Sequence, residues 1–222
     1  MNYTNILGAS VSMLLASSAI AAESSSDLVV KGSITPGAAC SLAVPASLNL
    51  GTIHRDELNP DPSKPTELEQ QEVDIQVTCP EPRRFAFVVR EAGGQDASNA
   101  QIFPIHSNQG EQQVGDLYLK FISHATLIDG STKGYATAAD RENDLGQATW
   151  GPSTPHTENL PIRNGLFAVG FVTHANSTEA PGNIDALVAR VMVKPWIKPA
   201  KDLDFTAEIG FSSDLGLEIS YF

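Results

Sequence analysis

Hydrophobic and polar residues alternate with a period of two along most of the chain, a pattern that predicts half-buried β-strands. The alternating stretches are short, and turn residues such as Asp129-Gly130 and Pro181-Gly182 separate them. No stretch sustains the period of 3.6 that a long amphipathic helix needs. Short strands with regular turns predict an all-β chain built as a β-sandwich, with strands near residues 28–34, 40–44, 48–50, 73–79, 85–89, 117–121, 166–172, 188–193 and 215–222.

Three segments depart from simple alternation. Leu117–Phe121 carries apolar residues on both faces, Tyr118 included, so we expect this strand to be buried on both sides. The nearly continuous apolar run Leu166–Val172 predicts a central strand. The long polar stretch from Thr132 to Thr149 predicts an excursion from the sandwich.

The chain ends on a strand pattern that no turn or polar tail follows. One face of this segment carries Leu215, Leu217, Ile219 and Tyr221, and the other carries Gly216, Glu218, Ser220 and Phe222. A strand whose edge is not covered exposes backbone N–H and C=O groups that pair readily with another chain. We therefore expect that a partner supplies part of the fold. The alternative is a complete sandwich in which this segment is an ordinary internal strand.

The first residues have the features of an export signal. Ile6–Ile20 is uncharged and largely apolar, and Ala19-Ile20-Ala21 forms a small-x-small cleavage site. We predict a signal peptide at residues 1–21 and a single mature domain at residues 22–222; the alternative is an uncleaved anchor. The formal charge of −12 disfavours nucleic acid and acidic membrane surfaces as partners. The sequence has no second apolar segment that could span a membrane, so we do not expect direct membrane insertion.

The cysteine count fits an exported chain. Cys40 and Cys79 are the two cysteines of the sequence, and in an oxidising compartment they most simply form one disulfide. Two buried free thiols are the alternative. Two cysteines alone do not make a structural zinc site, and neither has a histidine at ligand spacing.

Signs of catalysis are weak throughout the sequence. The five histidines are scattered, without a pair at metal-ligand spacing, and neither a nucleophile elbow nor a phosphate-binding glycine loop occurs. Asp140–Gly146 places its glycine one position late for a calcium loop and lacks the bidentate glutamate. Trp150 and Trp196 are expected to pack against the sandwich. We predict a protein that is not an enzyme and needs no cofactor or metal.

Four features in order resemble pilins of the chaperone–usher pathway of Gram-negative bacteria. They are Val30–Ile34 leading to Cys40, the Leu-Gly segment Leu48–Ile53, Cys79 at the end of an alternating strand, and Tyr221 in the penultimate position. The chain is also similar to a fimbrial-associated family, domain of unknown function 1120, through Gln113–Leu119, the Trp150 region and Pro199–Leu203.

This resemblance implies an immunoglobulin-like, pilin-type sandwich that lacks its seventh strand. It implies a periplasmic pilus chaperone, an outer-membrane usher and neighbouring fimbrial subunits as partners, in the periplasm and then in a fimbrium on the cell surface. A strand from the chaperone, and later from a neighbouring subunit, would fill the groove. By carry-over the interface with that strand comprises Leu215, Leu217, Ile219, Tyr221 and Phe222, with Phe222 supplying the carboxylate that the chaperone holds.

The N-terminal arm departs from the pilin pattern. Only the short polar stretch Ala22–Asp27, without glycine, precedes Leu28. Either Leu28, Val30 and Ile34 serve as a donor strand, or the subunit accepts a strand without donating one. The alternative function is a binding module in the periplasm or at a fimbrial tip, an adhesin or lectin-like protein with a self-sufficient sandwich and a host glycan or receptor as partner.

Overall fold

The computed structural model describes residues 39–45, 53–91, 101–107, 112–141, 144–155, 157–204, 209 and 211–222. They belong to one unit, Gly37–Phe222. The expected signal peptide, the proposed donor residues Leu28, Val30 and Ile34, and the strand expected near residues 48–50 lie outside the described residues. In the part that is described, no helix has the length and apolar character to cross a membrane.

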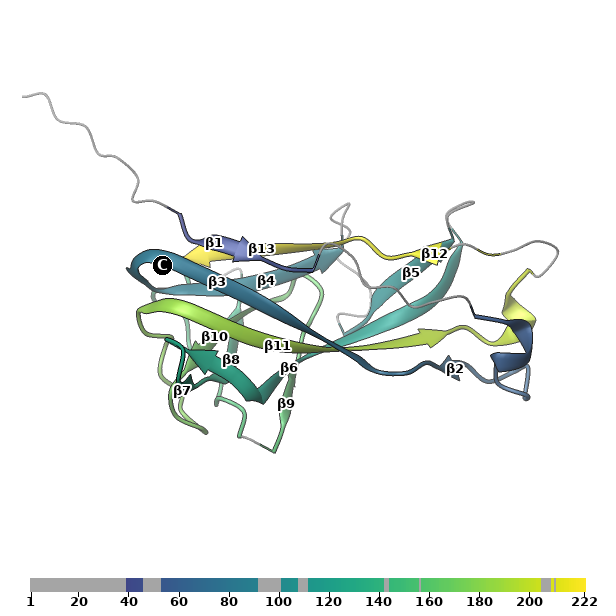
Figure 1. The fold of residues 1–222 in the computed structure, drawn as a ribbon, viewed down its shortest axis with the longest axis horizontal. Helices are drawn as coiled ribbons and strands as arrows, with labels where there is room; N and C mark the ends of the chain where they lie inside the picture. The colour runs from purple at the N-terminus through teal and green to yellow at the C-terminus, as the bar shows by residue number, and fades with distance from the viewer. Residues whose placement is uncertain are drawn as a thin grey trace, which may run out of the picture. The chain divides into compact units, whose positions relative to one another are not determined.

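The strands form two antiparallel sheets (Figure 1). The larger sheet has the order β1 (Ser41–Ala43), β3 (Gln71–Arg83), β11 (Ile184–Ile197), β6 (Gln113–Ile128), β5 (Phe103–Ser107) and β12 (Phe211–Ser212). Three short strands pair onto it: β2 (Thr66–Glu67) on β11, and β7 (Thr132–Lys133) and β9 (Asn159–Pro161) on β6. The smaller sheet has the order β13 (Leu215–Tyr221), β4 (Phe85–Glu91), β10 (Phe167–Val172) and β8 (Tyr135–Asp140).

Helical structure in the described residues is limited to two short 3₁₀ turns, η1 (Arg55–Glu57) and η2 (Ala200–Asp202). The all-β prediction is therefore confirmed, and the described residues form two antiparallel sheets and contain the predicted disulfide.

The main core lies between the two sheets. Phe87 of β4 and Phe171 of β10 meet Phe121 of β6, with ring centroids 6.0 Å apart for Phe87–Phe121 and 5.2 Å apart for Phe121–Phe171. All three side chains are almost fully buried. Buried aromatic pairs contribute beyond their burial of apolar area, so this contact across the sheets is a main source of packing energy.

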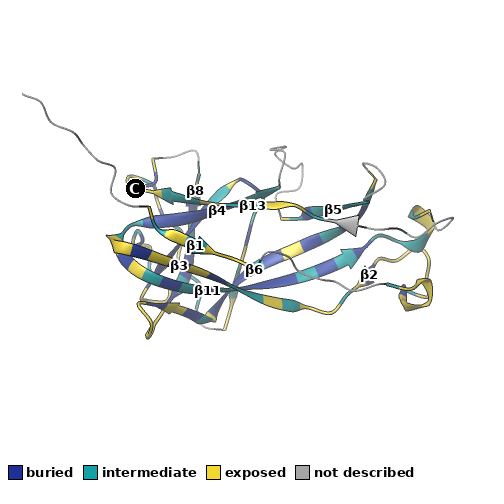
Figure 2. Ribbon diagram, turned by 45° about the horizontal axis from the view of Figure 1, so that its top comes forward, coloured by how far each residue is buried: buried dark blue, intermediate teal, exposed yellow. Residues whose placement is uncertain are grey.

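A second, smaller core covers the outer face of the smaller sheet. It contains Ala86, Val88, Ala139 and Ala168 from the sheet, with Leu145 and Trp150 packed over them. Trp150 is 2% exposed, so the prediction that it packs is confirmed. Because both faces of β4 are covered, its first five residues are all buried, and Figure 2 shows this strand in dark blue.

The interval expected as an excursion from the sandwich contains a strand of the smaller sheet, so that prediction is wrong. Tyr135–Asp140 forms β8, and Ala136, Thr137 and Ala139 are buried there. Small residues suit this strand because the segment around Gly151 packs closely against it. The Gly151 N–H donates to the Ala138 carbonyl at 2.9 Å. Their low hydrophobicity concealed a strand that is buried on both faces.

Two further predictions have different outcomes. The strand over Leu117–Phe121 exists as part of β6, but Tyr118 is 36% exposed, so burial on both faces is wrong at that position. The Asp129-Gly130 turn is confirmed: it joins β6 to β7, with φ of 49° and 78°. Glycine adopts a positive φ without strain, and aspartate tolerates it.

The disulfide between Cys40 and Cys79 is present, which excludes two free thiols. It ties the start of β1 to β3, where Ser41, Leu42 and Ala43 make the only register pairs of that short strand. The sequence separation is 39 residues, which corresponds to about 4 kcal/mol of lost unfolded-state entropy. β1 is therefore held mainly by a covalent bond.

Candidate functional site

β13 stands at the end of the smaller sheet. It pairs with β4 over its whole length, from Leu215 opposite Glu91 to Tyr221 opposite Phe85. Among the described residues β4 is its one strand partner. Within the described part of the chain, the backbone groups on its other side thus have no strand partner, which is the arrangement to which an extended peptide adds.

The inward-facing side chains of β13 are apolar but incompletely covered. Leu217 and Ile219 contact the main core and are only partly buried. Leu215 and Tyr221 at the two ends are 37% and 42% exposed. Aliphatic side chains over a core are usually buried completely, so this row has less cover than its composition predicts.

β1 runs near β13 in Figures 1 and 2. Leu42 of β1 packs against the same core and is partly buried, and Val44 just after it is 48% exposed. β1 belongs to the larger sheet and β13 to the smaller one, and the two are not hydrogen-bonded as strands. We call the row formed by Leu215, Leu217, Ile219 and Tyr221 the β13 edge.

One hydrogen bond connects the two strands at the end of this edge. The Cys40 backbone N–H donates to the Tyr221 hydroxyl oxygen at 2.9 Å. Tyr221, expected in the partner interface, thus also fixes the start of β1, while its ring remains 42% exposed.

The opposite face of β13 makes different contacts. Glu218 forms an exposed ion pair with Arg90, Oε2 to Nη2, at 2.7 Å. The Phe222 ring stacks on Trp150 at 5.6 Å, and the Arg84 guanidinium carbon lies 4.7 Å from the Phe222 ring centroid. The structure therefore brings Leu215, Leu217, Ile219 and Tyr221 together on one surface and places the Phe222 side chain on the other face of the sheet.

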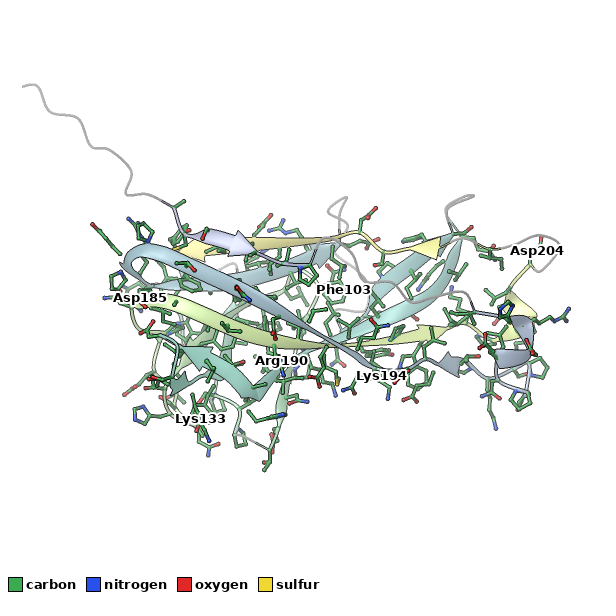
Figure 3. All side chains as sticks on the ribbon, viewed as in Figure 1. Phe103, Lys133, Asp185, Arg190, Lys194 and Asp204 are labelled. Carbon is green, nitrogen blue, oxygen red and sulfur yellow. A yellow bond between two sulfur atoms is a disulfide. The ribbon has the colours of Figure 1, made fainter. Side chains whose placement is uncertain are left out.

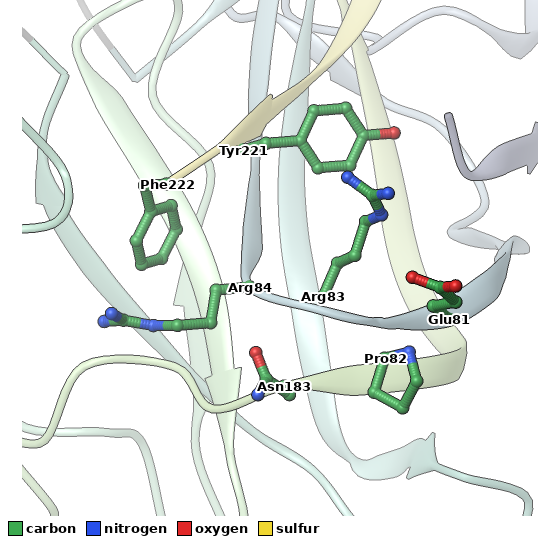
Figure 4. Close-up of a pocket in the computed structure, with 7 residues that line it drawn as sticks. All are labelled: Glu81, Pro82, Arg83, Arg84, Asn183, Tyr221 and Phe222. Carbon is green, nitrogen blue, oxygen red and sulfur yellow. The ribbon is translucent and has the colours of Figure 1, made fainter. Parts of the chain in front are cut away.

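A pocket of about 290 Å³ opens beside the C-terminal end of β13. Figure 4 draws the residues that line it: Glu81, Pro82, Arg83, Arg84, Asn183, Tyr221 and Phe222. Sequence reasoning missed this pocket. The signal in the sequence is the adjacent pair Arg83-Arg84 between two alternating strands.

The outer face of the larger sheet carries a separate group of side chains. Arg190 pairs with Asp74 at 2.8 Å, and Figure 3 labels Arg190 and Lys194 on β11. The hydrogen bond from Arg190 lowers the pKa of the Asp74 carboxyl below its ordinary value. Further along, the Tyr118 and Trp196 rings pack edge to face with centroids 6.1 Å apart.

Acidic and cationic groups surround that ring pair. Trp196 lies in register between Glu67 and Asp116, and the Lys194 Nζ lies 5.6 Å from the Trp196 ring centroid. Burial raises the pKa of the Asp116 carboxyl, while the hydrogen bond from Gln113 opposes that rise. In the described part of the chain no group of three His, Cys, Asp or Glu side chains is arranged as metal ligands.

Comparison with known proteins adds no family assignment. A scan against protein-family models matches no family, and a search of curated proteins finds no match. The resemblance to chaperone–usher pilins therefore rests on the residues named above.

Proposed function

We propose that this chain is a structural or accessory subunit of a chaperone–usher fimbria, with an immunoglobulin-like sandwich that a strand from a partner completes. The observation that carries the proposal is the apolar edge of β13, which has no strand partner on one side among the described residues. Leu217 and Ile219 are only partly covered there.

Strand addition fits this edge physically. A seven-residue strand laid along Leu215–Tyr221 would pair with the free backbone groups, and its alternate side chains would cover the exposed apolar row. Each aliphatic side chain so buried contributes on the order of 2 kcal/mol. An edge that attracts any exposed strand also favours aggregation of the unpartnered chain, which explains the need for a chaperone.

The resemblance to chaperone–usher pilins implies the sequence of events. After export to the periplasm, a pilus chaperone lends the strand, and at the outer-membrane usher a neighbouring subunit replaces it. Leu28, Val30 and Ile34 are the residues that would be donated in turn, and without donation the chain would occupy a tip or accessory position.

The test is recovery of mature protein, residues 22–222, with and without the cognate chaperone. We expect the chain alone to aggregate and the co-expressed chain to elute as a one-to-one complex. Leu215→Asp puts a charge on the partner side of the edge and should reduce complex recovery several-fold. Gly216→Asp adds the same charge on the other face, where an added Cβ has ordinary contacts at 3.7 Å from Arg90, and should not. A stable monomer without any partner would refute the proposal.

A second candidate is a glycan-binding module, favoured by the Tyr118–Trp196 pair. Aromatic rings stack on the C–H face of a sugar, and the neighbouring Glu67 and Asp116 carboxylates accept hydrogen bonds from its hydroxyl groups. A glycan screen tests it: binding should disappear in Trp196→Ala and persist in Tyr118→Phe, which keeps the ring. This candidate needs a sandwich that is stable without a lent strand.

A further inference from the structure

Alternation alone does not fix the register in which β13 pairs with β4. The inward side chains of β13 are all large and mainly apolar, and most of the residues opposite them on β4 are apolar as well. The opposed pairs are Leu215–Glu91, Leu217–Val89, Ile219–Phe87 and Tyr221–Phe85. A slip by one residue would turn the apolar row outward, but a slip by two residues keeps it on the inner face. The inner face therefore distinguishes poorly between the observed register and those two residues away.

The outer face of β13 is less repetitive, and its charged residue opposes one of the two slips. That slip would move Glu218 away from Arg90 to the place of Ser220, opposite Ala86, which is 0% exposed in the second core. Glu218 would lose its ion pair and approach an apolar surface, which is costly for a carboxylate. The other slip places Glu218 directly opposite Arg90, so the same ion pair persists and does not oppose it.

Phe222 opposes the slip that Glu218 allows. Its ring stacks on Trp150 with 5.6 Å between the centroids, and the Arg84 guanidinium carbon lies 4.7 Å from its centroid. The Phe222 N–H donates to the Arg84 carbonyl at 3.3 Å, so the ring stands in the row next to the pair Tyr221–Phe85. A slip by two residues would move the ring about 7 Å along the strand, and neither contact would persist in its present form.

Trp150 is a fixed reference for that ring. It is 2% exposed and packs in the second core, so it does not follow β13 when the strand slips. The slip would also break the hydrogen bond from the Cys40 N–H to the Tyr221 oxygen. Tyr221 is 42% exposed, however, and water replaces a hydrogen bond to an exposed hydroxyl at little cost. Figure 4 shows the Tyr221 and Phe222 side chains on opposite sides of the strand.

We propose that Phe222 is a positioning residue that fixes the register of β13 through its stack on Trp150. The consequence for partner binding rests on the proposed function. An added strand contacts alternate side chains of its neighbour, so a β13 slipped by two residues would present a different side chain at every place along its unpaired side. Phe222 thus acts on the β13 edge from the other face of the sheet.

Disulfide trapping between β13 and β4 measures the register. Gly216→Cys with Arg90→Cys places two thiols directly opposite each other on the outer face, where an added Cβ at Gly216 has ordinary contacts. Glu218→Cys with Arg90→Cys reports the slip. These two positions are opposite only after it and are diagonal, about 7–8 Å apart, in the observed register. Mass spectrometry of the digested full chain shows which cysteines are joined after mild oxidation.

The ratio of the two crosslinks is the readout. Phe222→Ala should lower the ratio of observed-register to slipped-register crosslink by about threefold or more, and Phe222→Tyr, which keeps the ring, should restore it. Leu217→Ala removes apolar area from the inner row and Ser220→Ala changes the outer face without removing a ring, so both should leave the ratio unchanged. A merely structural Phe222 would behave as Leu217 does, and an unchanged ratio in Phe222→Ala would overturn the proposal.

A milder variant keeps the proposal testable if Phe222→Ala does not fold. Phe222→Leu retains apolar bulk without the ring and should still lower the ratio; if it does not, the register assignment is wrong.

Recovery with the cognate chaperone separates this inference from the proposed function. Phe222→Ala should lower recovery of the complex several-fold, and Phe222→Tyr should restore it. A lower crosslink ratio with unchanged recovery would overturn the consequence for partner binding. A wild-type chain that forms no complex would refute strand complementation, while the crosslink ratio, measured without a partner, would still decide the role of Phe222.

Discussion

Removing the disulfide should cost about 4 kcal/mol of folding free energy and release β1. The loop-entropy relation gives this magnitude for the 39-residue separation of Cys40 and Cys79. β1 is paired only through Ser41, Leu42 and Ala43, and too few contacts remain to hold it once the bond is cut. The Cys40 hydrogen bond to Tyr221 should be lost with it.

Urea unfolding of the Cys40→Ala, Cys79→Ala double variant measures this cost. Wild-type protein treated with a thiol reductant is the matched control, because it loses the same bond without a change of sequence. Amide exchange should show loss of protection in β1 before global unfolding. A loss below about 1 kcal/mol at unchanged m-value would refute the reasoning, since β1 would then be held by its own pairing.

Three further substitutions test the packing and the electrostatics. Gly170→Ala should destabilise the fold by about 2 kcal/mol or more, because an added Cβ would lie 2.2 Å from a proline side chain, whereas Gly182→Ala, with nothing within 4 Å, should be nearly neutral in thermal unfolding. Phe121→Ala should cost about 3–5 kcal/mol in urea unfolding, since it empties the centre of the aromatic contact between the sheets. The pKa of Asp74 is lowered from 3.8 by Arg190, so the pair stabilises the fold above that pH and loses its effect as the pH falls below it. The difference between wild type and Asp74→Asn should be under about 1 kcal/mol at pH 7 and shrink toward pH 2 in pH-dependent unfolding.

Alternation predicted strands best where one face meets the core and the other meets water, although β5 (Phe103–Ser107) was missed. β3 and β13 belong to this class, and their alternation placed both correctly. β8 was missed because the second core buries its small residues under Leu145 and Trp150, which belong to the segment that follows β8 in the chain. Tyr118 was misplaced for the opposite reason: it packs against the Trp196 ring but remains 36% exposed, and an amphipathic ring is stable in such a position.

The residues of the candidate site were also predictable only in part from the sequence. The apolar row of β13 follows from a period of two, so Leu215, Leu217, Ile219 and Tyr221 were predicted as one surface and lie as one surface. The pocket depends on which strand ends meet, which sequence spacing does not encode. Arg83 and Tyr221 are far apart in the chain and come together only because β13 pairs with β4.

The two edge strands of the smaller sheet, β8 and β13, differ in how far the described residues cover them. At β8 the chain covers its own edge: the N–H groups of Gly151 and Thr154 donate to the carbonyls of Ala138 and Ala136, each at 2.9 Å. At β13, at the other end of the same sheet, the described residues provide no equivalent cover, although its inward side chains are larger and more apolar. A protein that merely tolerated exposed edges would leave the small, polar edge open and close the apolar one. The reverse arrangement is what we expect if, as proposed, the β13 edge binds a strand of another chain.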